Sequence, residues 1–223
     1  MKTLCCFMFL FCLNVFSVLA QVEQNSFKSI NSEEQVTQVE GNNGSYWTVS
    51  LSGGATLYQG EWDRDMKKAD FITPYGKLSV ARWFSSVWGI RMQMDGGVFK
   101  NGAVKIWEPD SNGKFNFVDG YLEFITNVMN WGESKDSNRP VSVYLYGGGG
   151  VAWTPARNDL SAKVSPGMIL GGQVNFRLTD FWSIALEVDG TIVKDKFNSH
   201  TGGRKYEGTV GVTAGLVYRF SQK

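Results

Sequence analysis

Apolar and polar residues alternate along the stretch 205–220, close to the end of the printed chain. One face carries Tyr206, Val210, Val212, Ala214, Leu216, Tyr218 and Phe220. The other face is small or polar, with Val217 as the one apolar exception. Successive side chains of a strand point to opposite sides, so this pattern predicts a strand with one apolar face. Its length and its aromatic ends suit a strand that crosses a bilayer.

The same alternation occurs in seven earlier stretches. They are residues 47–58, 74–84, 88–99, 115–131, 141–153, 165–178 and 182–193. The connections between them are alternately long and short, as in bacterial membrane barrels with long outer loops and short periplasmic turns. An open sheet edge cannot face lipid, so the strands must close on themselves. The sequence therefore predicts an all-β fold, an eight-stranded antiparallel up-and-down transmembrane β-barrel over residues 46–220.

The stretch 74–84 does not reveal which of its faces points outward. Leu78, Val80 and Phe84 share a parity with Arg82, whereas Tyr75, Ala81 and Trp83 share the other with Lys77. An arginine facing lipid at depth costs a few kcal/mol, which favours Arg82 inside. Near the rim its side chain could instead reach the water. The phase of this strand is left open, and Arg82 is included in the interior set.

The first twenty residues have the pattern of a secretory signal peptide. Lys2 precedes an apolar run over residues 4–15, and Val18-Leu19-Ala20 suits cleavage after Ala20. All three cysteines lie in this leader, so the exported chain would have no disulfide and no thiol chemistry. Residues 21–45 are rich in Gln, Glu, Asn and Ser and predict a flexible periplasmic segment. Residues 221–223 would form a short tail.

Charge and motifs exclude several functional classes. Basic and acidic residues nearly balance, which gives no indication of a nucleic-acid partner. His200 is the one histidine, so no histidine-pair metal site is expected, and the chain shows no phosphate-loop or dinucleotide motif. We therefore expect no metal, no cofactor and no enzymatic activity.

Charged residues gather on the face that the barrel would turn inward. The expected interior network is Arg82, Arg91, Asp95, Asp119, Glu123, Arg177, Glu187, Asp189 and Arg219. If Phe99 pairs with Phe115, Arg91 lies opposite Glu123 and Asp95 opposite Asp119. An eight-stranded barrel is just wide enough for side chains to fill it. The network is either a gate whose ion pairs separate or a polar core that satisfies the interior.

Aromatic residues and glycines suggest further features. One aromatic set lies near the periplasmic rim and another near the outer rim, and interfacial girdles would explain both. The first set is Trp47, Trp83, Trp88, Trp131, Trp182, Tyr218 and Phe220, and the second includes Tyr58, Phe99, Phe115, Phe117 and Trp153. Trp62 and Trp107 lie in loops and are candidate contacts for an extracellular ligand or host surface. The glycine run 147–150 marks either a bend or a place with no room for side chains.

Two stretches carry a resemblance to a known family. The run from Trp47 to Tyr58 (WTVSLSGGATLY), followed by the run from Ala81 to Arg91 (ARWFSSVWGIR), resembles the small N-terminal barrel of OmpA-like outer membrane proteins. The resemblance implies a Gram-negative outer-membrane location, contact with outer-membrane lipid and a structural, adhesive or weakly pore-forming role.

The end of the last strand carries a second part of this resemblance. Tyr218 and Phe220 look like the C-terminal aromatic signal that the barrel-assembly machinery reads. The chain departs from the family in that the printed sequence has no peptidoglycan-binding domain and three residues follow Phe220. We expect a monomer.

Two other classes remain open. A barrel enzyme that acts on lipid or peptide at the cell surface would need catalytic residues in the loops, where His200 is the main candidate. A soluble, lipocalin-like ligand-binding barrel would place the apolar faces inward.

Overall fold

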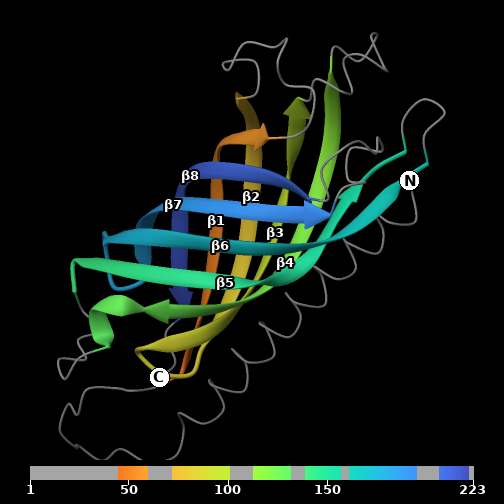
Figure 1. Ribbon diagram of the computed structural model, residues 1–223. Helices are drawn as coiled ribbons and strands as arrows, with labels where there is room; N and C mark the ends of the chain where they lie inside the picture. The colour runs from red at the N-terminus through yellow and green to blue at the C-terminus, as the bar shows by residue number, and fades with distance from the viewer. Residues whose placement is uncertain are drawn as a thin grey trace, which may run out of the picture. The chain divides into compact units, whose positions relative to one another are not determined.

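The computed structural model describes residues 45–59, 72–100, 113–131, 139–156, 161–194 and 206–220, which lie in one compact unit, Asn43–Ser221. They form eight strands and one short 3-10 helix (Figure 1). The strands are β1 (Tyr46–Gln59), β2 (Ile72–Trp83), β3 (Trp88–Lys100), β4 (Lys114–Asn127), β5 (Val141–Thr154), β6 (Lys163–Arg177), β7 (Trp182–Lys194) and β8 (Tyr206–Phe220), and the helix is η4 (Val128–Asn130).

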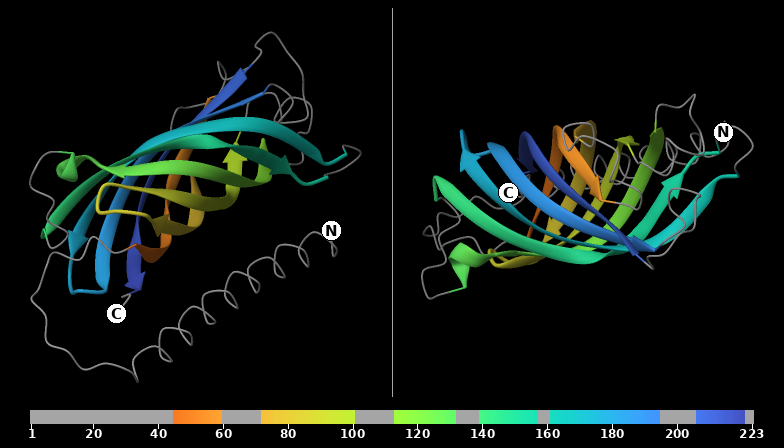
Figure 2. Two further views of the ribbon diagram at one scale, coloured as in Figure 1. Left: turned by 90° about the horizontal axis from the view of Figure 1, so that it is seen from below. Right: turned by 45° about the horizontal axis from the view of Figure 1, so that its top comes forward.

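The strands close into a single barrel. Each strand pairs antiparallel with the next one in the chain, and β8 pairs with β1, so the sheet has no free edge. Figure 2 shows the strands running obliquely around the barrel. The predicted eight-stranded antiparallel barrel is confirmed, and the register that pairs Phe99 with Phe115 is confirmed with it.

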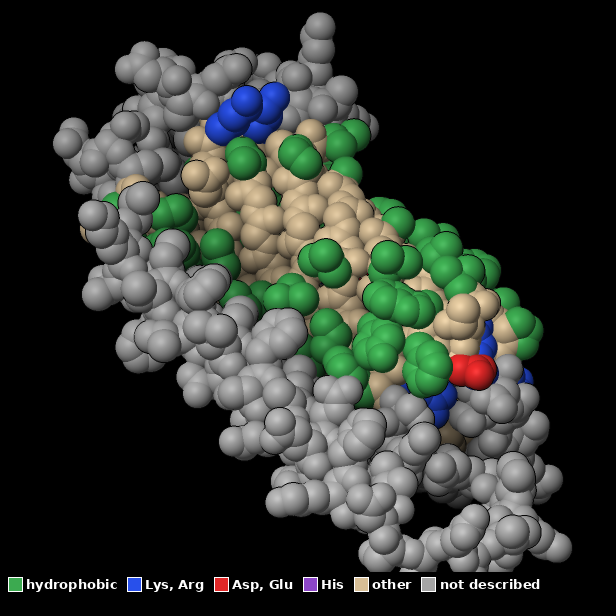
Figure 3. Space-filling model, turned by 180° about the vertical axis from the view of Figure 1, so that it is seen from behind, with side chains coloured by type: hydrophobic (Ala, Val, Ile, Leu, Met, Phe, Trp, Pro, Cys, Tyr) green, Lys and Arg blue, Asp and Glu red, His purple; other side chains and the backbone are tan. Residues whose placement is uncertain are grey.

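The two faces of the sheet differ as the alternation predicts. Outward side chains are mainly apolar, and Leu51, Met168 and Leu170 expose 68%, 70% and 72% of their surface. Figure 3 shows apolar side chains over the middle of the visible described surface, among backbone and uncharged side chains, with charged side chains near its ends. Most of the buried residues are polar or charged. This arrangement contradicts the lipocalin-like alternative, which requires the apolar faces inside.

The structure shows which face of β2 points inward, and the prediction that Arg82 lies in the interior is wrong. Its odd-numbered residues are buried, so Lys77 points inward and Arg82 outward. The Arg82 guanidinium lies 5.2 Å from the ring centroid of Trp47 and donates to the Ser45 hydroxyl at 2.7 Å. Arg82 is one residue from the end of β2, where a long side chain can reach water while it faces outward.

Strand β4 ends earlier than the predicted 115–131. It stops at Asn127, whose side chain accepts a hydrogen bond from the Met129 amide at 3.1 Å. The cap starts η4, and Asn130 is buried with its amide donating to the Ser86 carbonyl at 2.9 Å. A local side-chain cap of this kind replaces the strand ladder.

Several predictions lie outside the described residues: the signal peptide, the segment 21–44, the loop residues Trp62 and Trp107, and His200. Within the described part of the chain, no helical segment is long and apolar enough to cross a membrane.

Candidate functional site

An ion-pair network crosses the interior of the barrel. Arg91 on β3 is 2% exposed, and its Nε lies 2.5 Å from Oε2 of Glu123 on β4. Its Nη1 lies 3.2 Å from Oε2 of Glu187 on β7 and 3.0 Å from Oε1 of Gln173 on β6. The Arg91 guanidinium also stacks 3.7 Å from the ring centroid of Tyr146. One arginine thus connects strands that are not neighbours in the sheet.

Lys77 on β2 extends the ion-pair network to Asp189. Its ammonium group is ion-paired with Asp189 and lies 4.0 Å from Oε2 of Glu187. Tyr146 donates to Glu187 at 3.1 Å, and Tyr75 donates to Asp189 at 3.4 Å. Glu187 is therefore shared between two cations. Buried charges need such paired and hydrogen-bonded surroundings.

Asp95 and Asp119 face each other in the register of β3 and β4. Asp95 accepts from the Gln93 amide at 3.1 Å, and Asp119 accepts from the Tyr121 hydroxyl at 3.4 Å. The second oxygen of each carboxylate is buried with no hydrogen-bond donor among the described residues. Within the same residues, no group of three or more His, Cys, Asp and Glu side chains is placed to hold a metal ion.

Aromatic side chains close the interior at the end opposite the short turns. Phe99 and Phe117 stack with centroids 3.7 Å apart, and Phe115 lies 5.7 Å from Phe99. All three are almost fully buried, together with Tyr75, Ala152 and Val193. They form an apolar plug, so the prediction that they belong to an outer girdle is wrong. Trp83 is likewise 3% exposed and packs inside near Tyr144, away from the surface girdle.

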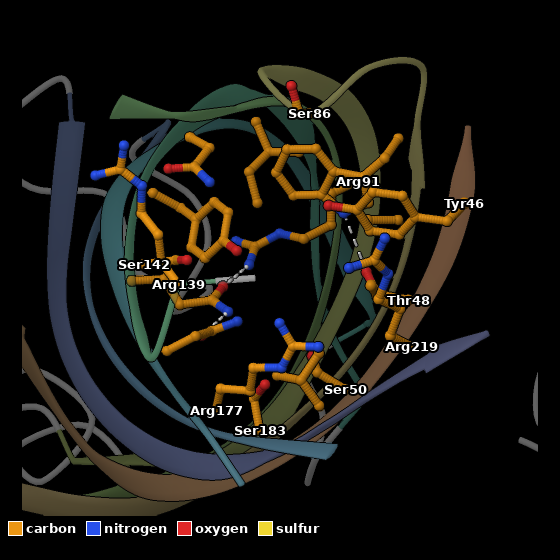
Figure 4. Close-up of a pocket in the computed structure, with 18 of the residues that line it drawn as sticks. Tyr46, Thr48, Ser50, Ser86, Arg91, Arg139, Ser142, Arg177, Ser183 and Arg219 are labelled. Carbon is orange, nitrogen blue, oxygen red and sulfur yellow. Dashed lines mark hydrogen bonds between the residues drawn. The ribbon is translucent and has the colours of Figure 1, made fainter. Parts of the chain in front are cut away.

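A basic vestibule opens at the short-turn end, where residues 84–87 and 178–181 connect the strands. It encloses about 80 Å³, and Arg91, Arg139, Arg177 and Arg219 are among its lining residues. Figure 4 shows the guanidinium groups of Arg91, Arg177 and Arg219 directed into this space. Arg219 lies 4.0 Å from the ring centroid of Tyr46, and Arg177 is paired with Asp180 at 2.7 Å.

The structure divides the predicted interior set into four groups. Arg91, Glu123, Glu187 and Asp189 join the ion-pair network, and the interior carboxylates Asp95 and Asp119 lie beside it. Arg177 and Arg219 line the vestibule, and Arg82 is outside.

Sequence reasoning missed two residues of this interior. Lys77 was on the face left open, yet its mid-strand position would have identified it as the charge that cannot face lipid. Arg139 was missed because it lies outside any alternating stretch.

Solved structures provide the comparison, since no known family model and no curated protein matches the chain. The neisserial surface protein A (NspA) matches with a TM-score of 0.56 and 13% identity, over 79% of this chain and 99% of that one. The chain has the fold of an eight-stranded outer-membrane barrel. At this identity the match shows the fold alone.

Two further solved structures of bacterial outer-membrane proteins also match. The N-terminal β-barrel domain of Pseudomonas aeruginosa OprF has a TM-score of 0.47 and 11% identity, over 78% of this chain and 97% of that one. A major outer membrane protein of Thermus thermophilus has a TM-score of 0.47 and 14% identity, over 78% and 99%. The described strands place apolar side chains outward and mainly polar side chains inward.

Proposed function

We propose that the chain is an outer-membrane barrel of a Gram-negative bacterium whose interior is closed, and that it serves as a rigid anchor for its long connections. The observation that carries this proposal is the filled interior: the Arg91 network spans the lumen, and the Phe99–Phe117 stack closes it beyond. A structural or adhesive role follows, because a barrel without a lumen acts through its surface and loops.

Two parts of this proposal depend on residues beyond the described ranges. We propose that Trp62 and Trp107 contact an extracellular ligand and that His200 has no catalytic role. We further propose that lipid surrounds the apolar belt and that the barrel-assembly machinery reads Tyr218 and Phe220. Tyr218 packs against Trp182 at 4.9 Å and Phe220 at 4.8 Å, which supports a fixed aromatic edge at this end of β8.

A narrow, gated pore is the second candidate function. It is favoured by Glu187, whose Oε2 lies within 3.2 Å of Arg91 and 4.0 Å of Lys77. A carboxylate shared by two cations has an alternative partner, so the Arg91 pair could part without leaving that charge alone. Opening would also require the aromatic plug to move.

Single-channel conductance of the refolded mature chain in a planar bilayer tests the closed interior. We expect a silent bilayer from a barrel whose folding is established by heat-modifiable gel mobility. Discrete openings that change with Glu123→Ala or Arg91→Ala would overturn the closed barrel in favour of the gated pore. Arg82→Ala is the matched control, because Arg82 lies outside the lumen and should leave any such openings unchanged.

A further inference from the structure

The vestibule at the short-turn end concentrates positive charge in a small space. Four arginines line it, and Asp180 is the one carboxylate among the described residues that do so. Glu123 and Glu187 offset the charge of Arg91, and Asp180 offsets that of Arg177. Within the described residues, no carboxylate lies within ion-pair distance of Arg219. Among the described lining residues, Arg219 is therefore a cation whose charge no carboxylate offsets.

Two of these arginines have donors ready for a ligand. The Nη2 atom of Arg91 is buried, and no described residue accepts a hydrogen bond from it. Buried donors in folded proteins are nearly always paired with protein groups or bound molecules. The stacking of Arg219 on Tyr46 holds its guanidinium plane in place, and Figure 4 shows that plane turned toward the same space as Arg91.

We propose that the vestibule binds a compact oxyanion, a phosphate or a carboxylate group, between Arg91, Arg177 and Arg219. The planar guanidinium fork matches two oxygens of such a group, and charge-assisted hydrogen bonds are stronger than neutral ones. Trp83, Tyr144 and Ile125 are among the walls of the vestibule, and apolar surface beside a charged group lowers the local dielectric constant and strengthens the attraction. The enclosed volume of about 80 Å³ suits a small group and excludes a folded partner.

The site does not depend on whether the barrel conducts. Its lining arginines lie on the short-turn side of the aromatic plug, so a bound anion is within reach of that end whether or not the plug opens. An oxyanion free in solution and a carboxylate of a protein chain share this chemistry. Phosphate and acetate, added separately, represent these two sources.

Isothermal titration calorimetry of the refolded mature chain, in a zwitterionic detergent at constant ionic strength, tests the proposal. We expect saturable binding of inorganic phosphate or of acetate, and the tighter probe indicates the source. Arg219→Gln should weaken binding of that probe roughly tenfold, the loss of one charge-assisted contact. Arg177→Gln removes a second lining arginine and provides the same test if Arg219→Gln does not fold.

Arg82→Gln is the matched control for these variants. Arg82 is an arginine near the same end of the barrel that faces outward, so its loss removes one charge and no vestibule contact. Equal weakening by Arg82→Gln and Arg219→Gln would show a general charge effect and overturn the site. The absence of saturable binding of either probe to the folded wild-type barrel would also overturn it, whatever the conductance experiment shows.

Discussion

Arg91 is the residue through which the barrel interior is held together. It contacts Glu123, Glu187, Gln173 and the Tyr146 ring at once, and these partners come from four different strands. The guanidinium group suits such a position because it offers several donors in one plane and stays charged. Arg91 stabilises the barrel by offsetting the charges of Glu123 and Glu187, because a buried carboxylate without a cation beside it would be costly.

Replacing Arg91 by methionine should destabilise the barrel strongly. Arg91→Met keeps the bulk of the side chain but leaves Glu123 and Glu187 buried without that cation, and breaking a buried pair costs about 3–5 kcal/mol. Urea unfolding in lipid vesicles, followed by tryptophan fluorescence, measures this loss. Arg82→Met is the control: it removes an outward cation from the Trp47 ring and should cost about 1 kcal/mol or less. Similar losses in both variants would contradict the role given to Arg91.

At this scale the sequence predicts neighbours in the sheet but not contacts across the lumen. The Arg91–Glu123 pair follows from the register of adjacent strands, which turn length and alternation define. The Lys77–Asp189 pair joins β2 and β7, which are not adjacent, and no local pattern relates them. Parity alone, however, would have placed Phe99 with Arg91 and Asp95 on the inward face. The prediction assigned Phe99 to an aromatic girdle instead and did not apply the parity of the strand.

The glycine run of β5 shows how one strand fits a narrow barrel. Gly148 and Gly150 point toward the interior, where a Cβ would collide with carbonyl oxygens of β4. Gly147 and Gly149 point outward and have more room. The sequence left two interpretations of this run open, a bend or a lack of room for side chains. The structure supports the lack of room, and it applies to Gly148 and Gly150 only.

An alanine scan of two adjacent glycines should separate these faces. Gly150→Ala would place a Cβ against the Gly120 carbonyl and 2.7 Å from Cδ1 of Tyr121, so we expect a loss of about 1–3 kcal/mol from overpacking. Gly149→Ala has its nearest atom at 3.9 Å and should change the free energy of unfolding by about 0.5 kcal/mol or less. Urea titration of both variants measures the difference. Equal effects would mean that interior space does not restrict β5.

The outward face was predicted for every strand except β2, and the end of β4 was placed too late, and both differences have physical causes. Strand β2 carries a cation on each face, so composition cannot decide between them, whereas depth can: Lys77 is central and Arg82 is near the end. The prediction extended strand β4 to Trp131, because the apolar alternation continues at Val128. The Asn127 cap and the buried Asn130 stop it, and the Asn130 contact depends on Ser86, a residue far away in the chain.

At the scale of the whole molecule, the proposed lipid bilayer around the barrel explains both its apolar exterior and its charged interior. In the proposed outer-membrane setting, a bilayer accepts the exposed Leu51, Met168 and Leu170, which water would penalise as a continuous belt. The same belt leaves the interior as the one place for mid-strand charges, and these must then neutralise one another. The outward position of Arg82 near a strand end agrees with this division, because the cost of a lipid-facing cation falls toward the membrane surface.

This division predicts a dependence of stability on depth that a soluble barrel would not show. Leu51 lies near the middle of β1 and pairs with Leu78 and Leu216, and we expect Leu51→Arg to cost about 2–4 kcal/mol in lipid vesicles. Leu178 follows the last residue of β6 at the short-turn end, and Leu178→Arg should cost about 0–1 kcal/mol. Both leucines are more than half exposed, at 68% and 57%, so neither substitution disturbs the packed interior. Unfolding titrations in lipid measure the two costs. Equal and small costs would mean that the apolar belt does not face hydrocarbon, and the outer-membrane proposal would fall with it.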